Sequence, residues 1–594
     1  LVAYLLGITA VDPLKHKLLF ERFLHEGRTG MPDIDVDFDT SRRAEVLAWM
    51  HERWGEAHTA MTANVVTFRL RMAVREMGKV LGFPLPLLDQ ATKLLTHAGS
   101  KYVREFKAEL AEALGDSPAL EVLCSLVESL DECPRHLSLH SGGMILSRQP
   151  LRYLSPIQTS ANGVRQIQFS KDDVERLGLI KFDVLGLRML AVVSEAQSLI
   201  ESTEDKSTFD VDDLPDNDPA TYELIRSGET LGLFQIESPG QWNLLSKVQP
   251  EHFDDLVVQV ALFRPGPLQG NMVHPYILRR RGLAQVGYPH PSLESALHDT
   301  FGVILFQEQV LEVAHVFAGL TLAEADEFRK LMSKFRDPGA MESMRDKFVN
   351  GAITTHQDTP HPISKTLANR VFELVAKFVG YGFCRSHAAA FARTVYQSAY
   401  LKAHYPAQYM AGVLQHQPGF YPMQTLLEEA RRLGVPVLPP CLHRSQVKYS
   451  LETDLNNTLA IRVPFSQIDG ISDDTASLIV LERALAPFTA LDDALERLRL
   501  PIDDWENMAR SGALAQFGER REVLWQVRAY VREQYGIKGK HYYNPDQLLL
   551  DVKNVPDAPP LSILERSQLI DWDFQTQSLT TGPHPLTLHR GELN

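Results

Sequence analysis

Residues 32–38 read Pro32-Asp33-Ile34-Asp35-Val36-Asp37-Phe38, so every second position carries an aspartate. Successive side chains of a β-strand point to opposite faces, and we therefore expect Asp33, Asp35 and Asp37 on one face and the apolar residues on the other. Aspartate is disfavoured in strands and neighbouring carboxylates repel one another, so the pattern indicates a compensating cation. Mg²⁺ is the simplest candidate, because it takes oxygen ligands and binds one or two protein carboxylates together with substrate phosphates. A solvated edge strand is the alternative; a calcium-binding loop fits poorly, since its central glycine and downstream glutamate are missing.

A further aspartate lies within the apolar run Lys181-Phe182-Asp183-Val184-Leu185-Gly186-Leu187. A buried carboxylate is costly unless it meets a cation, a hydrogen-bond donor or a metal ion. Joined with Asp33 and Asp35, Asp183 would complete a three-carboxylate site for two metal ions, which is typical of phosphoryl transfer. The alternative is that Asp183 caps the helix that follows.

The segment His140-Ser141-Gly142-Gly143 precedes an apolar strand. Adjacent glycines allow backbone N–H groups to approach a phosphate, and His140 would add charge. An ordinary turn at Gly142 and Gly143 explains the same residues.

A basic cluster extends from Arg329 to Lys347, where six basic residues outnumber three acidic ones in a chain of net charge −15. Lys330 and Lys334 are four residues apart and adjoin Arg329, so one helix face can present all three to a triphosphate or a template backbone. The alternative is a solvated helix face.

The segment Gln467-Ile468-Asp469-Gly470-Ile471-Ser472 precedes a helical pattern that starts at Asp473. A hairpin of this kind, with Ile468, Gly470 and Ser472, points backbone N–H groups at one phosphate independently of base sequence. We expect Gly470 in a conformation that needs no Cβ. An ordinary glycine turn is the alternative.

The composition of the whole chain excludes several classes of protein. The 594 residues predict about three to five domains, and contents of 44% hydrophobic and 23% charged residues exclude disorder and collagen as overall descriptions. Four scattered cysteines and the lack of a long apolar run favour a cytoplasmic protein outside the membrane. We expect a helix capped by Thr40 or Ser41, and a mainly helical segment from Val65 to His136.

These segments, in this order, resemble the bacterial C-family DNA polymerases, the DNA polymerase III alpha subunits, over nearly the whole chain. The matching motifs are Pro32–Phe38, Gly142-Gly143, Lys181–Leu187, Ala261–Leu268, Phe306–Val310 and Tyr381–His387. The resemblance implies a multidomain α+β fold with a nucleotidyltransferase-like palm, a helical thumb, large helical fingers and a helix-hairpin-helix module. The expected bounds are 1–64 and 139–187 for the palm, 65–138 for the thumb, 188–440 for the fingers, 441–535 for the module and 536–594 for a C-terminal extension.

The same resemblance implies a DNA-directed DNA polymerase that adds deoxynucleoside triphosphates to a primer 3′ end. Asp33, Asp35 and Asp183 match the family's catalytic, metal-binding aspartates, which hold two Mg²⁺ ions, whereas Asp37 is not an essential ligand. The residues expected to bind the nucleotide are His140, Gly142, Gly143, Arg329, Lys330, Lys334 and His387, with His387 near the incoming sugar. Ile468, Gly470 and Ser472 are expected to bind DNA.

Three segments look like the error-prone, damage-inducible branch of the family: Gln417–Pro422 with Ala430–Val435, Gly518–Trp525, and Thr581–Pro585. Phe182–Arg188 reads closer to the main replicase. We therefore expect error-prone translesion synthesis in DNA repair, with the replicative alpha subunit as the alternative.

Family members carry an N-terminal phosphoesterase-like domain, a Gly-Ser loop before a segment like Leu1-Val2-Ala3-Tyr4, and a C-terminal oligonucleotide-binding domain. We therefore expect this chain to be a fragment, and a truncated, non-catalytic primer-template or clamp-binding scaffold is the alternative function. The expected partners are primer-template DNA, deoxynucleoside triphosphates, a sliding clamp, and mutasome or replisome accessory proteins. Gln547, Leu549 and Leu550 are candidate clamp-binding residues, unless these leucines form a short strand packed on the chain itself.

Overall fold

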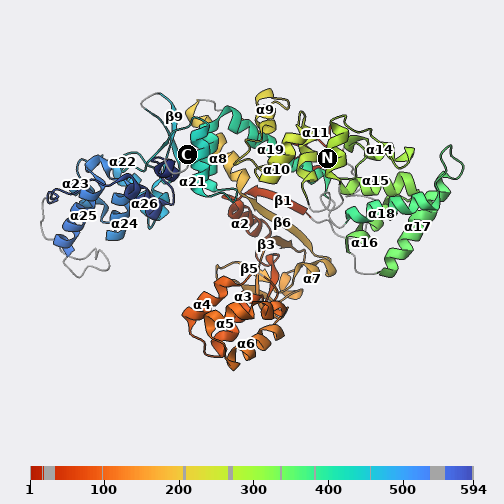
Figure 1. Ribbon diagram of the computed structural model, residues 1–594, viewed down its shortest axis with the longest axis horizontal. Helices are drawn as coiled ribbons and strands as arrows, with labels where there is room; N and C mark the ends of the chain where they lie inside the picture. Colours follow the sequence, from red (N-terminus) through yellow and green to blue (C-terminus); the bar gives the residue numbers. More distant parts are fainter. Residues whose placement is uncertain are drawn as a thin grey trace. The chain divides into compact units, whose positions relative to one another are not determined.

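The computed structural model describes residues 2–16, 18, 34–96, 98–204, 209–264, 272–334, 338–379, 383–454, 457–535 and 555–590. The chain divides into two compact units, which we call the sheet unit (29–187) and the helical unit (1–28 with 188–594) (Figure 1). Asp33 lies outside the described residues, as do Gln547, Leu549 and Leu550, and the side chains of Lys330 and Lys334 are not described either.

The sheet unit is built on a mixed six-stranded sheet of order β1-β6-β3-β2-β5-β4. Strand β1 runs parallel to β6, and β3 is antiparallel to both β6 and β2. The strands are β1 (Ile34–Asp39), β2 (Thr59–Thr67), β3 (Pro134–Leu146), β4 (Ile157–Thr159), β5 (Arg165–Ile167) and β6 (Ile180–Leu187). The two aspartate-bearing segments of the sequence are therefore neighbouring strands, although about 145 residues of chain separate them.

The two faces of the sheet differ as the alternating sequence predicts. Phe38, Phe182 and Val184 pack in one cluster with Met50 of helix α2 (Arg43–Trp54). Because side chains alternate along a strand, the aspartates between them lie on the opposite face. The predicted helix exists, but its cap is Arg42 rather than Thr40 or Ser41, since the backbone N–H of Ser41 is held by the Asp39 carboxylate in the turn before it.

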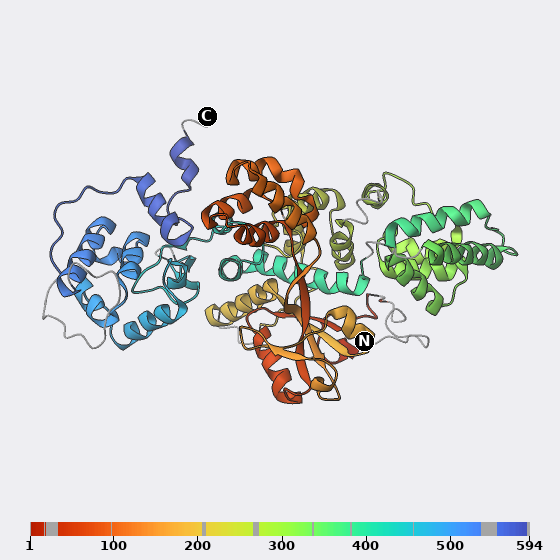
Figure 2. The same cartoon turned by 90° about the horizontal axis from the view of Figure 1, so that it is seen from below.

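A helical insertion between β2 and β3 has a hydrophobic core of its own. It contains α3 (Leu70–Val80), α4 (Leu85–Leu94), η1 (Ser100–Phe106), α5 (Lys107–Leu114) and α6 (Pro118–Ser129). The buried cluster runs from Leu70 to Val127 and includes no residue of the sheet (Figure 2). The mainly helical segment predicted for 65–136 is confirmed in its middle, whereas both of its ends are strands.

The helical unit begins with a long run of packed helices in which α19 (Arg385–His404) packs against α8, α9, α11 and α20. The other helices are α8 (Arg188–Thr203), α9 (Pro219–Ser227), α10 (Pro239–Val248), α11 (Phe253–Leu262), α13 (Val273–Arg280), α14 (Glu294–Leu297), α15 (Gln307–Ala318), α16 (Leu322–Lys334), α17 (Pro338–His356), α18 (Lys365–Val379), α20 (Pro406–His416) and α21 (Met423–Arg432). Residues 1–28 group with this unit: Lys15 pairs with Asp216, and the ring of His16 lies tilted against that of Phe253, with the centroids 4.6 Å apart.

A small sheet and a second helical cluster complete the unit. The sheet has the order β7-β9-β8, with β7 (Val437–Leu438), β8 (Ser450–Thr453) and β9 (Leu459–Arg462). The helices that follow are α22 (Asp473–Leu485), α23 (Leu491–Leu498), α24 (Ile502–Ser511), α25 (Arg520–Tyr535) and α26 (Arg566–Gln577). They share one buried core around Trp505 and Phe465.

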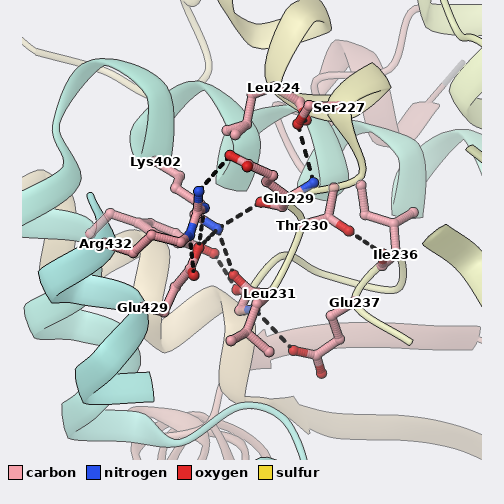
Figure 3. Close-up of polar contacts among 12 residues, drawn as sticks. Leu224, Ser227, Glu229, Thr230, Leu231, Ile236, Glu237, Lys402, Glu429 and Arg432 are labelled. Atoms are coloured by element: carbon pink, nitrogen blue, oxygen red, sulfur yellow. Dashed lines mark hydrogen bonds and ion pairs between the residues drawn. The ribbon is translucent and has the colours of Figure 1, made fainter. Parts of the chain in front are cut away.

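A buried ammonium group joins three segments of the helical unit (Figure 3). Lys402 of α19 donates to the carbonyl oxygens of Glu229 and Leu231, at 2.9 and 2.8 Å, and to the Glu429 carboxylate of α21 at 2.6 Å. Its side chain is fully buried, and Arg432 also pairs with Glu429. All three donors of the ammonium are thus satisfied, which is the condition for burying a charge.

We expect Lys402→Met to destabilise the helical unit by about 3–5 kcal/mol, because two carbonyl oxygens lose their donor and the buried Glu429 carboxylate loses one of its two cationic partners, keeping Arg432. The exposed pair of Lys448 with Glu195, 3.5 Å apart, provides the control. Lys448→Met should cost less than about 1 kcal/mol. Urea unfolding followed by tryptophan fluorescence measures both, and equal effects of the two substitutions would contradict this interpretation.

Candidate active site

The register of three strands places Asp35, Asp183 and Gly143 in one row across the sheet. Asp35 of β1 is the partner of Asp183 of β6, and Asp183 is the partner of Gly143 of β3. Directly paired residues on adjacent strands project to the same face, about 5 Å apart. Asp183 lies inside β6, so the alternative that it caps a helix is wrong.

The Asp183 carboxylate is nearly buried and has one oxygen without a partner. Its side chain is 13% exposed, and Oδ2 accepts a hydrogen bond from Lys181 Nζ. Among the described residues nothing donates to the buried Oδ1, and the buried Thr62 hydroxyl on β2 also lacks a partner. A Cβ on Gly143 would lie 3.1 Å from Thr62 Oγ1 and 3.3 Å from Asp183 Oδ1. Glycine at 143 therefore keeps open a small space lined by oxygen atoms.

His140 borders the same space, with a defined tautomer. The backbone N–H groups of Gly142 and Gly143 donate to His140 Nδ1, at 3.2 and 2.8 Å. Because Nδ1 accepts, the ring proton of the neutral imidazole is on Nε2. The 3.8 Å approach of Nδ1 to Asp183 Oδ1 is consequently not an ion pair. The two glycine N–H groups expected to face a phosphate are already used, and a phosphate would have to displace the imidazole to reach them.

Arg43 ties together the strands that carry these groups. It opens α2, directly after β1, and its guanidinium donates to Val184 O of β6 at 2.7 Å and to Ser141 O of β3 at 2.6 Å. These bonds lie just beyond the last paired residues of β3 and β6, Gly143 and Asp183. The side chain thus replaces the backbone bonds where the two strands stop pairing, next to the carboxylates. Nothing in the local sequence around Arg43 indicated this contact.

The donor set suits a hard cation. Asp35 and Asp183 offer carboxylate oxygens on one face, including the orphan Oδ1, and burial raises the pKa of Asp37 on the same face. Oxygen donors of this kind are the ligands that Mg²⁺ prefers. Within the described ranges no group of three acidic, histidine or cysteine side chains is arranged to hold a metal; Asp33, the third expected ligand, lies outside those ranges. Asp35 and Asp183 would hold the ion.

A second cluster forms in the helical unit around Phe383, which pairs with Phe306 through an isolated β-bridge. We call it the Phe383 cluster: Arg264, Phe306, Gln307, Arg329, Phe383 and His387. Gln307 N–H donates to Phe383 O at 2.9 Å, the Gln307 side chain accepts from Arg329 at 3.5 Å, and the His387 ring lies 5.1 Å from that of Phe383. The structure thus brings together two of the residues predicted to bind the nucleotide.

The charge of Arg329 is compensated within the protein. Its guanidinium pairs with the buried Asp326 at 2.9 Å, one turn earlier on α16. Among the described residues no carboxylate pairs with Arg264, another member of the cluster, whose guanidinium lies 3.3 Å from the centre of the Phe383 ring. The sequence did not single out Arg264 as a functional residue, although it lies in the matching segment Ala261–Leu268.

The predicted hairpin forms at 468–472. Gly470 is exposed with φ +86°, so the expectation of a conformation that needs no Cβ is confirmed. Ile468 is buried, and the Ser472 side chain caps α22 by accepting from Thr475 N–H at 3.1 Å. The Asp469 carbonyl accepts from Asn507 of α24 at 2.9 Å, which fixes the loop against the next helix pair.

Within the described residues, no helix combines the length and the apolar character needed to cross a membrane.

Comparison with known proteins matches three parts of the chain to family profiles. Residues 1–186 match the bacterial DNA polymerase III alpha NTPase domain, and residues 189–356 match the bacterial DNA polymerase III alpha subunit finger domain. Residues 434–524 match a helix-hairpin-helix motif. Only two residues separate the first two profiles. The same family therefore accounts for the six-stranded sheet, its helical insertion and the segment around Phe306.

Full-length relatives agree with the profiles. The error-prone DNA polymerase 2 of Rhizobium meliloti (strain 1021) is 37% identical over 601 aligned positions, which cover 100% of this chain and 54% of that protein. The error-prone DNA polymerase of Symbiobacterium thermophilum is 38% identical over 552 positions, covering 89% of this chain and 50% of the relative. That of Burkholderia pseudomallei is 37% identical over 615 positions, with 100% and 55% covered. The chain spans about half the length of these relatives.

One buried carboxylate beside the hairpin predicts a pH dependence. Burial, with a smaller contribution from neighbouring Asp503, raises the pKa of Asp504 on α24 to about 6. The folded protein therefore holds a proton that the unfolded chain releases, and this contribution to stability decreases as the pH rises from about 4 to 6. Asp504→Asn should stabilise the protein by about 2–3 kcal/mol at pH 8 and have little effect at pH 4.

Urea unfolding of wild type and variant at the two pH values measures this difference. Asp503→Asn, at the exposed neighbouring position, is the matched control and should change the pH dependence only slightly. A stabilisation by Asp504→Asn that is equal at pH 4 and pH 8 would show that titration of this carboxyl is not its cause.

Proposed function

Because the chain belongs to the bacterial DNA polymerase III alpha-subunit family, we propose that it is part of a template-directed DNA polymerase that adds deoxynucleoside triphosphates to a primer 3′ end. The observation that carries the proposal is the row formed by Asp35 and Asp183, with its unpartnered buried oxygen. The names of the relatives favour error-prone synthesis over the main replicase. We extend the proposal to synthesis across damaged templates. The proposed site is completed by Asp33.

In this proposal Asp33, Asp35 and Asp183 would hold two Mg²⁺ ions. Bound there, Mg²⁺ would supply a lowered pKa for the primer 3′-hydroxyl and positive charge against that developing on the triphosphate. The chain's own groups set the geometry: Lys181 orients the Asp183 carboxylate through Oδ2 and leaves Oδ1 for a ligand. Arg43 bonds to both β3 and β6 and so helps to fix the position of His140 relative to the carboxylates.

Each unit carries residues that are proposed to bind the nucleotide. In the sheet unit His140 presents its Nε2–H as a neutral donor, because Nδ1 is fixed by Gly142 and Gly143. In the helical unit the contacts are Arg329, Lys330, Lys334 and His387. The His387 ring lies between Phe383 and Phe391, with its centroid 5.1 and 4.1 Å from theirs, and this gives the sugar a rigid flat surface.

The hairpin 468–472 is proposed to bind the DNA backbone. Gly470 stands exposed at its tip, and Ser472 begins α22, whose N-terminus carries a partial positive charge. Contacts of this kind position a duplex without reading its bases. Gln547, Leu549 and Leu550 stay the proposed contact for a sliding clamp, and accessory proteins of a mutasome are proposed as further partners.

Primer extension by the full-length protein that contains this chain tests the function. Asp35→Ala and Asp183→Ala should each reduce metal-dependent extension by about 10³-fold or more while primer-template binding survives. Asp37→Ala is the matched control, since this carboxylate shares the face but is not proposed as a ligand. It should keep extension within about tenfold of wild type.

Two outcomes would overturn the assignment. Near-normal extension by Asp183→Ala would exclude the carboxylate row as the active site. Tight primer-template binding by the wild type without any metal-dependent extension would favour the non-catalytic scaffold.

A further inference from the structure

Arg264 is a half-buried cation at the end of α11, and an aromatic ring holds it in place. Its guanidinium lies 3.3 Å from the centre of the Phe383 ring, the separation expected for flat stacking. The hydrogen bond that the structure gives this side chain is a long one, from Nε to Val260 O at 3.4 Å. Because this bond is made by Nε, it does not occupy the two terminal nitrogens of the guanidinium.

Four other arginines of the helical unit that are buried to a similar degree each have a carboxylate partner. The pairs are Arg280 with Asp255, Arg329 with Asp326, Arg385 with Asp299, and Arg393 with Asp216. Among the described residues no carboxylate pairs with Arg264, and burial is the one influence that lowers its pKa. The adjoining residues 265–271 and 380–382 contain no Asp or Glu in the sequence.

Lack of a carboxylate is not by itself a sign of a ligand site, as Arg483 shows. Burial also lowers the pKa of Arg483, but its Nη1 donates to the carbonyl oxygens of Leu442 and Ser445, at 3.0 and 2.7 Å. Those bonds explain its burial as structural. Arg264 has no equivalent pair of short bonds among the described residues, so its partial desolvation is uncompensated, a cost that an anionic ligand would remove.

The position of Arg264 indicates which kind of anion it takes. Phe383 is also the residue that links Gln307 and Arg329 to His387, the groups proposed to hold the nucleotide. Since the charge of Arg329 is compensated by Asp326, the uncompensated charge of this cluster is that of Arg264. A planar guanidinium can donate two parallel hydrogen bonds to one phosphate, and stacking on a ring lowers the entropy lost on binding.

We propose that Arg264 is a phosphate-binding residue, whose guanidinium is held over the Phe383 ring to receive a phosphate group of the reacting nucleotide or of the DNA backbone. The inference rests on the proposed function for the identity of the ligand. It adds a binding residue that the basic cluster of α16 does not include.

Equilibrium binding tests this role without requiring turnover. Kd values of the full-length protein are measured for a deoxynucleoside triphosphate and, separately, for a primer-template duplex at several salt concentrations. We expect Arg264→Gln to raise one of the two Kd values by about tenfold or more, the loss expected for a charge-assisted contact. A change confined to the nucleotide assigns the triphosphate. A change in the duplex value, with the salt slope reduced by about one, assigns a backbone phosphate.

Two further variants keep the test decisive. Arg226→Gln removes a half-buried arginine that donates to Pro250 O in the same unit, and should leave both Kd values within twofold. Arg264→Lys keeps the charge without the planar fork, and should recover part of the lost affinity even if Arg264→Gln proves too unstable to measure. The proposal would be overturned if Arg264→Gln folds and its Kd values for both ligands are unchanged. If only Arg264→Lys folds, unchanged Kd values in that variant would overturn it. If a Kd depends on Arg264 but the full-length protein does not extend a primer, the polymerase function is rejected and the phosphate-binding role of Arg264 stands.

Discussion

Parallel pairing of β1 with β6 forces two carboxylates side by side on one face of the sheet. The register that matches Asp35 with Asp183 is set by the apolar residues on the other face, where Phe38, Phe182 and Val184 pack with Met50. A slip of one residue would turn the aspartates into that core, which the cost of burying charge forbids. Hydrophobic packing on one face of the sheet therefore holds the two carboxylates close together on the other face, where they repel each other. Arg43 bridges β3 and β6 just beyond their last backbone pair, Gly143 with Asp183.

Local pattern was enough to predict the parts of the site that depend on neighbouring residues. The alternation of aspartate with apolar residues predicted which side chains lie on each face of β1. The hairpin motif predicted that Gly470 has a positive φ. The pairing of β1 with β6 joins residues 148 positions apart, and the local sequence left open whether Asp183 was a metal-binding strand residue or a helix cap. The resemblance to a known family, not periodicity, favoured Asp183 as the third carboxylate.

The features that sequence reasoning missed all depend on long-range contacts of side chains. Arg43 reaches carbonyl oxygens on two other strands, and His140 takes the N–H groups of Gly142 and Gly143 that were expected to bind a phosphate. In the helical unit a run of basic residues drew attention to α16, yet Arg329 is neutralised by Asp326. A count of charges along the chain cannot show which of them are already paired. This is why Arg264, alone in its stretch of sequence, was not recognised.

The central claim is that Asp35 and Asp183 together bind a divalent metal ion, and Mn²⁺ binding followed by electron paramagnetic resonance tests it most directly. The measurement needs neither DNA nor turnover, and compares the full-length wild type with Asp183→Asn, a substitution that keeps the size of the side chain. The account predicts that Asp183→Asn weakens Mn²⁺ binding at this site by at least about tenfold, because it removes a charged oxygen ligand. Equal Mn²⁺ affinity in the two proteins, both folded, would contradict it.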